Sequence, residues 1–113
     1  MKAPTRDIVA NYAATLEAHM LTFEWDANKD KQNLRKHGVS FAEASTVFGD
    51  PFSIVFEDPD HSKEEDRFLI AGHSYKDRLL IVSFTERENR IRIISARKMT
   101  ARERKDYEEA IGK

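Results

Sequence analysis

The second half of the chain is a series of short apolar runs joined by short polar links, and this pattern most constrains the fold. The runs are PFSIVFED (51–58), RFLIAGHSY (67–75), RLLIVSFTE (78–86) and RIRIISARK (90–98). Each has the length and the β-branched or aromatic content of a strand, and the links KD and RENR are too short for a crossover helix. The sequence therefore predicts an antiparallel meander.

A further strand and a helix are expected before this series. LTFEW (21–25) alternates apolar and polar residues like a short strand, and Asp26 follows it as a good helix N-cap. The next residues predict a helix that ends at Gly38, because glycine readily adopts the left-handed conformation found after a helix C-terminus.

Two capping patterns predict two more helices. Ser40 and Glu43 have the spacing of a capping box, as do Thr100 and Glu103 near the end of the chain. The helix predicted after Ser40 is short and carries no outward base-reading residues. It therefore does not favour a DNA-binding helix-turn-helix. The predicted fold is α+β: an antiparallel meander sheet with two N-terminal helices and a C-terminal helix.

The chain has 113 residues, the length of one domain. Residues 5–20 form an amphipathic pattern with an apolar stripe at Ile8, Tyr12, Leu16 and Met20. MLTFEWD, which starts at Met20, looks like the natural beginning of a compact domain. We therefore expect an N-terminal helical extension over 1–19 and a compact domain over 20–113, and the stripe makes a homodimer a reasonable expectation.

Composition narrows the compartment and the chemistry. Cysteine is absent, no apolar run approaches 18 residues, and the N-terminus lacks the apolar stretch of a signal peptide, so a cytoplasmic location is expected. The four histidines fit no metal-ligand spacing, and the acidic loop 57–66 is read as a solvated loop rather than a magnesium site. No phosphate-binding glycine loop or nucleophile elbow occurs, so neither a cofactor nor a metal is expected.

Charge is unevenly distributed along the chain. The formal net charge is −1, yet the segment 86–105 holds eight Arg or Lys against three Glu. A basic patch of this kind suits a phosphate backbone, and arginine binds phosphate through two parallel hydrogen bonds. The alternative is that these arginines pair with the acids of the loop 57–66.

Alternation along a strand determines which arginines can act together. In the run 90–98, Arg90 and Arg92 are expected on one face, and Arg97 on the other with Ile93, unless a bulge intervenes. In the run 67–75, Arg67 and His73 are expected on one face.

Three segments carry a family resemblance: FEWDANKDKQNLRKHGVSFAEASTVFGDP, HSKEEDRFLIAGHS and RLLIVSFTERENRIRIISARKMTARERKDYEE. Together, from about Leu21 to Glu109, they resemble the BrnT family of bacterial type II toxins. The resemblance implies a RelE-like ribonuclease fold and toxicity through RNA cleavage and inhibition of translation. It also implies a BrnA-type antitoxin with a ribbon-helix-helix domain, through which the complex would bind operator DNA. The segment 1–19 departs from the family pattern.

Metal-independent RNA cleavage through a 2′,3′-cyclic phosphate needs a base, cations that stabilise the phosphorane, and an acid. The family does not determine these roles, because RelE-like toxins vary in their catalytic residues. The catalytic candidates in this sequence are Arg67, Arg92, Arg97, His37 and Glu57. The candidates for RNA binding are Lys36, Arg87 and Arg90.

Two other classes of function stay open at this stage. A non-catalytic RNA- or ribosome-binding module would use the same basic residues without cleaving RNA. A protein-interaction module would use the arginines in ion pairs with a partner.

Overall fold

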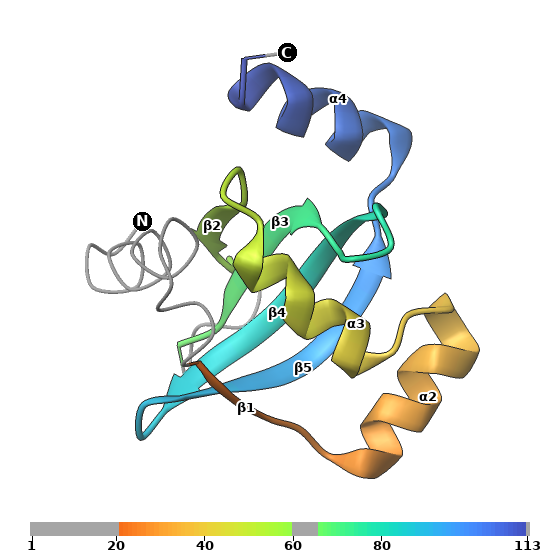
Figure 1. Ribbon diagram of the computed structural model, residues 1–113, viewed down its shortest axis with the longest axis vertical. Helices are drawn as coiled ribbons and strands as arrows, with labels where there is room; N and C mark the ends of the chain where they lie inside the picture. Colours follow the sequence, from red (N-terminus) through yellow and green to blue (C-terminus); the bar gives the residue numbers. More distant parts are fainter. Residues whose placement is uncertain (1–20, 60–65, 113) are drawn as a thin grey trace.

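The computed structural model describes residues 21–59 and 66–112, which form a five-stranded sheet with helices on both faces (Figure 1). The strands are β1 (Thr22–Glu24), β2 (Ile54–Glu57), β3 (Phe68–His73), β4 (Leu79–Arg87) and β5 (Arg90–Lys98). Their order across the sheet is β1-β5-β4-β3-β2. The expected extension over 1–19 lies outside the described residues.

The sheet is mixed, so the predicted antiparallel meander is wrong for the sheet as a whole. β2 to β5 pair antiparallel in chain order, but β1 pairs parallel with the outer edge of β5, with Thr22 opposite Arg90. Short links determine the direction of β3, β4 and β5. No short link joins β1 to β5, because helices and the strands β2, β3 and β4 lie between them in the chain. The local sequence therefore does not determine the direction of β1.

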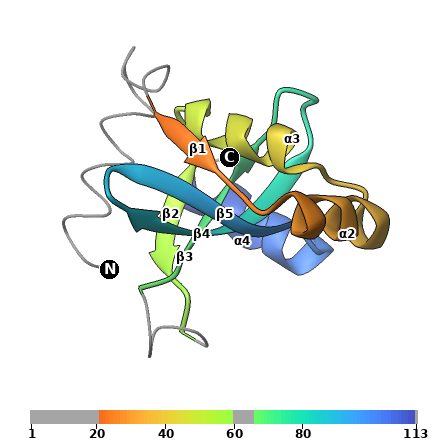
Figure 2. The same ribbon diagram turned by 90° about the horizontal axis from the view of Figure 1, so that it is seen from below.

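In the part of the chain that the structure describes, three α-helices complete the α+β fold. α2 (Ala27–His37) lies beside the β5 edge, α3 (Phe41–Ser45) continues into the 3₁₀ turn η2 (Thr46–Gly49), and α4 (Ala101–Ala110) follows β5. Figure 2 shows α3 and α4 on opposite faces of the sheet. Within the described residues, no helix is long and apolar enough to span a membrane.

Helix ends follow the predicted capping chemistry with one exception. The Asp26 carboxylate accepts hydrogen bonds from the N–H groups of Asn28 and Lys29, and Gly38 ends α2 with a φ of 71°. Thr100 and Glu103 form a complete capping box. Ser40 accepts the N–H of Glu43 at 3.0 Å, but the Glu43 side chain bonds elsewhere, so this second box is only half formed.

The main core lies between the sheet and α3. Its fully buried large side chains include Phe41, Phe48, Ile70, Phe84 and Ile93. Aromatic rings meet there edge to face, with 4.9 Å between the ring centroids of Phe48 and Phe84. A smaller cluster on the other face joins Ala71 and Ile81 to Tyr107 of α4. Burial on both faces explains why β3 and β4 read as nearly continuous apolar runs.

Asn33 fastens α2 to the sheet by imitating a strand. Its side-chain amide donates to the carbonyls of Ala96 (2.8 Å) and Val39 (2.9 Å), and its carbonyl oxygen accepts the Ala96 N–H at 3.1 Å. β1 pairs only with residues 90–92 of β5. The Asn33 amide therefore continues the ladder farther along the same edge.

α4 is held by an ion pair and by a tyrosine. Both oxygens of the Glu103 carboxylate accept hydrogen bonds from Arg97, at 2.7 and 2.8 Å. These bonds lower the pKa of Glu103 to about 2. Farther along α4, the buried Tyr107 donates its hydroxyl to the carbonyl of Phe52 at 3.0 Å. Desolvation is the main cause that raises the pKa of this phenol to about 12.

Replacing Asn33 by Ala should lower the free energy of unfolding by about 2–4 kcal/mol, since it leaves the buried N–H and C=O of Ala96 without partners. Urea denaturation would measure the change. Gln32→Ala, at an exposed neighbouring position of the same helix, is the matched control. An equal effect of the two substitutions would contradict the strand-like role of Asn33.

The Arg97–Glu103 pair should make stability depend on acid pH. Because folding lowers the pKa of Glu103 from 4.5 to about 2, its contribution is complete above pH 4.5 and is lost as the pH falls toward 2. Solvent screening of this half-exposed pair leaves about 1–2 kcal/mol. Denaturation of the wild type and of Glu103→Gln should show a gap at pH 7 that narrows by pH 3, and a gap that does not change with pH would contradict this account.

Candidate functional site

A β-bulge decides which side chains of β5 share a face. Ser95 pairs with Ser83, but the next pair along β4 is Phe84 with Ile93, which leaves Ile94 without a partner. The alternation therefore shifts by one residue within β5. As a result Ala96 joins Ile93 in the main core, and Arg97 turns to the α4 side of the sheet.

Arg92 and Arg97 therefore do not point to opposite faces, because the bulge, which the sequence prediction named as its exception, is present. Cross-strand partners lie on the same face of a sheet, and Thr85 pairs with Arg92 while Arg87 pairs with Arg90. Arg67 directly precedes β3, where alternation places it on the face of Leu69, which is the α4 side too. We call the positions 67, 87, 90 and 92 the arginine face.

Within the described residues, Glu24 of β1 contacts two of these arginines. Its oxygens lie 3.5 Å from Nη1 of Arg90 and 3.3 Å from Nη1 of Arg92. The Arg90 side chain is 58% exposed and that of Arg92 is 34% exposed. Such long, solvent-screened contacts are weak. Two guanidinium groups thus share one carboxylate, and they keep donors available for an anionic ligand.

Arg97 has a different role from its neighbours on the same face. Its bidentate contact with Glu103 raises its own pKa, chiefly through the hydrogen bonds to that carboxylate. Its fork is therefore already occupied by a carboxylate of this chain. The geometry makes Arg97 an anchor of α4 rather than a free phosphate ligand.

The structure does not place the predicted proton-transfer residues on the arginine face. His37 and Lys36 lie at the end of α2, which packs beside the outer edge of β5. Glu57 ends β2 opposite Phe68, a residue of the main core, so the alternation assigns it to the α3 side. Arg67 directly precedes Phe68, so its side chain lies on the other side of the sheet. Only the arginines among the candidates gather on one face.

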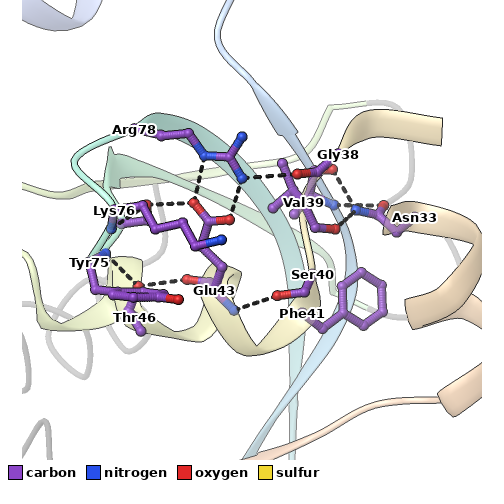
Figure 3. A network of polar contacts seen from close by, with 12 residues as sticks. Asn33, Gly38, Val39, Ser40, Phe41, Glu43, Thr46, Tyr75, Lys76 and Arg78 are labelled. Atoms are coloured by element: carbon purple, nitrogen blue, oxygen red, sulfur yellow. Dashed lines mark hydrogen bonds and ion pairs between the residues drawn. The ribbon is translucent and has the colours of Figure 1, made fainter. Parts of the chain in front are cut away.

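A buried ion pair that the sequence did not indicate sets the position of the end of α2 (Figure 3). The carboxylate of Glu43, 2% exposed, accepts hydrogen bonds from Nε and Nη2 of Arg78 and from the Ser74 hydroxyl at 2.7 Å. The Arg78 bonds are the largest cause that lowers the pKa of Glu43. Arg78 also donates to the carbonyl of Gly38 at 2.9 Å. The pair therefore joins α3, the β3–β4 turn and the residue that follows His37.

A second unpredicted cluster surrounds Asp50. Its carboxylate accepts the backbone N–H of His73 at 2.7 Å and lies 3.4 Å from Nδ1 of the same residue. Gly72 makes room for it, because a Cβ there would lie 2.9 Å from the Asp50 oxygen. The His73 ring lines a cleft of about 360 Å³ and meets the ring of Tyr107 edge to face. Asp50 and His73 are too far apart in sequence for any spacing rule to connect them.

The described part of the chain contains no group of three or more acidic, histidine or cysteine side chains arranged to hold a metal ion. Its charged groups instead form two features: ion pairs that hold the helices in place, and the arginine face. This arrangement suits the binding of an extended polyanion along the sheet.

Comparisons with known proteins agree with this reading of the fold. A family model described as "Ribonuclease toxin, BrnT, of type II toxin-antitoxin system" matches residues 25–103. The crystal structure of the Brucella abortus ribonuclease toxin BrnT is similar, with a TM-score of 0.56 and 23% sequence identity. That match covers 71% of this chain and 97% of the other. The search of curated proteins gives no match.

The family model covers well over half of the chain, and the α+β architecture found here is shared with a solved member of that family. The chain therefore belongs to the BrnT family of ribonuclease toxins of type II toxin–antitoxin systems.

Proposed function

We propose that this protein is a metal-independent endoribonuclease that cleaves cytoplasmic RNA and thereby inhibits translation. The arginine face is the observation that carries the proposal, because it brings guanidinium groups from three strand segments to one side of the sheet. The finer fold description that we propose is RelE-like. A BrnA-type antitoxin with a ribbon-helix-helix domain would neutralise the toxin and carry the complex to operator DNA.

Cleavage proceeds by attack of a 2′-hydroxyl on the adjacent phosphorus. The base removes the 2′-OH proton, the new P–O bond closes a 2′,3′-cyclic phosphate, and the 5′-oxygen leaves with a proton from the acid. Negative charge builds up on the non-bridging oxygens as the phosphorane forms. Arg92 and Arg67 stabilise that charge, since planar guanidinium forks match phosphate oxygens in pairs.

RNA binding extends from the reacting phosphate toward the β4–β5 turn. Arg87 and Arg90 face each other as cross-strand partners there, and both are exposed. They would hold the neighbouring phosphates through charge, with little dependence on base sequence. Glu24 contacts the same guanidinium groups in the absence of RNA, and the phosphates of the RNA backbone, which guanidinium forks bind through paired hydrogen bonds, displace it.

His37 and Glu57 are the candidates for proton transfer, and Lys36 for RNA contact beside His37. His37 is a half-buried imidazole at the rim of the sheet, next to the Gly38 carbonyl that Arg78 holds. Glu57 is half-buried and lies at the end of β2, across from the residue that follows Arg67. Because neither residue lies on the arginine face, single substitutions of His37 and Glu57 test whether either one takes part in cleavage.

Arg92→Ala should lower the rate of RNA cleavage about 100-fold, because removal of one preorganised donor to a developing oxyanion typically costs this much. Arg102→Ala is the matched control, since that side chain is 84% exposed on α4. Primer extension on cellular mRNA measures new 5′ ends directly. Equal cleavage by the two variants would exclude Arg92 from the site. Growth arrest by the wild type without any new 5′ ends would favour a non-catalytic RNA-binding module.

A 2′-deoxy substitution at the scissile nucleotide should abolish cleavage, because it removes the nucleophile, while EDTA should leave the rate unchanged. Mass spectrometry of the products should detect the 2′,3′-cyclic phosphate. Cleavage of the 2′-deoxy substrate, or loss of activity in EDTA with recovery on adding Mg²⁺, would overturn the metal-independent mechanism.

A further inference from the structure

The groove between α4 and the sheet is a cavity of about 340 Å³ that the proposed mechanism does not use. Its apolar lining comes from the β2–β4 part of the sheet and from the α4 region: Ile54, Phe56, Ala71, Ile81, Met99 and Tyr107. We propose that this groove binds one unstacked base of the RNA substrate and favours guanine. This inference rests on the proposed ribonuclease function and adds a base preference to it.

Strand register connects the groove to the arginine face. Phe56 pairs with Leu69, Leu69 with Ser83, and Ser83 with Ser95, so these residues form one row across the sheet. Thr85 and Arg92 form the next row on the same face, two residues farther along β4. Two residues of a strand span about 7 Å. β2 and β5 are three strand spacings apart, about 14 Å across the sheet, so Phe56 lies about 16 Å from Arg92. A base on Phe56 therefore lies about two to three nucleotides from a phosphate held at Arg92.

Phe56 gives the groove a surface for stacking. It is a partly exposed aromatic residue on the edge strand β2, with 37% of its surface accessible. Proteins that bind single-stranded RNA stack unpaired bases on aromatic side chains of this kind. Stacking alone accepts any base, so the preference must come from a polar group.

Asp106 is the polar group at the rim that has acceptor capacity to spare. Its side chain is 63% exposed and forms a loose ion pair with Arg102, whose Nε lies 3.6 Å from Oδ1, beyond hydrogen-bond distance. The other carboxylate that lines the groove, Glu103, is bound by Arg97. Guanine presents N1–H and N2–H side by side, and an ionised carboxylate accepts two such donors with its two oxygens. Uracil offers only one N–H, so it fits the rim less well.

Base preference tests the groove without relying on overall activity. Cleavage sites of the wild type, mapped over a pool of RNAs, should show enriched guanine at one position about two to three nucleotides from the scissile bond. Phe56→Ala should lower kcat/KM about tenfold through lost stacking. Phe52→Ala is the matched control, because Phe52 is an exposed aromatic residue (62%) that does not line the groove.

Asp106 is tested by pairing a protein change with a change in the base. Replacing guanosine by inosine at the enriched position removes the N2 amino group. This change should slow the wild type about tenfold, as expected for a hydrogen bond to a charged acceptor, and should have little effect on Asp106→Asn. Glu109→Gln, an exposed carboxylate of α4 outside the groove, should respond like the wild type.

Several outcomes would overturn the proposal while leaving the ribonuclease function intact. They are an even base distribution at the cleavage sites, equal kcat/KM for Phe56→Ala and Phe52→Ala, and equal inosine effects in all proteins. A dimer of the wild type that dissociates on Phe56→Ala would assign the groove to a second copy of the chain instead.

A binding measurement separates this inference from the proposed function. If the wild type turns out to cleave no RNA, guanosine monophosphate should still shift the NMR signal of the Met99 methyl group more than uridine monophosphate does. Absence of that difference at saturating nucleotide would overturn the groove assignment independently of catalysis.

Discussion

The pairing of β4 with β5 is the constraint on which the rest of the structure depends. It is the longest pairing in the sheet, and the bulge at Ile94 sets the direction of the side chains on both sides of it. Without the bulge, Arg97 would point into the main core and Ala96 would leave it. A charged group in that core would need a buried partner, at a cost of several kcal/mol. The extra residue thus lets Ala96 fill the main core while Arg97 points to the same side of the sheet as the arginine face.

The basic surplus of the segment 86–105 divides into two groups with different physical roles. Arg97 donates hydrogen bonds to both carboxylate oxygens of Glu103 and thereby fixes α4 against the sheet. Arg90 and Arg92 share only distant contacts with Glu24. The first arrangement contributes to stability, and the second leaves charge for a ligand. Arg97 is thus neutralised within the chain, by Glu103 of α4 rather than by the acids of the loop 57–66 that the sequence suggested. Phosphate binding by Arg90 and Arg92 stays a proposal.

Positioning in this small fold is achieved by polar groups that join elements distant in sequence. Asn33 fastens α2 to β5, Glu43 and Arg78 join α3 to the β3–β4 turn, and Asp50 fills the space left by Gly72. Each of these groups is buried or half-buried, so its hydrogen bonds are costly to break. Together they hold the helices on a sheet that carries the arginine face on its α4 side.

The sequence by itself determined most of the local structure. Asp26, Gly38 and Thr100 set helix ends through bonds to their own neighbours, and short polar links determined that β3, β4 and β5 run antiparallel. The family motifs could also be recognised from the sequence, since each is a short continuous stretch of residues. Tertiary structure decided the direction of β1, the bulge at Ile94, and the partners of Glu43 and Asp50. These features depend on contacts between residues far apart along the chain, where packing of the core, and not the local pattern, selects the arrangement of lowest free energy.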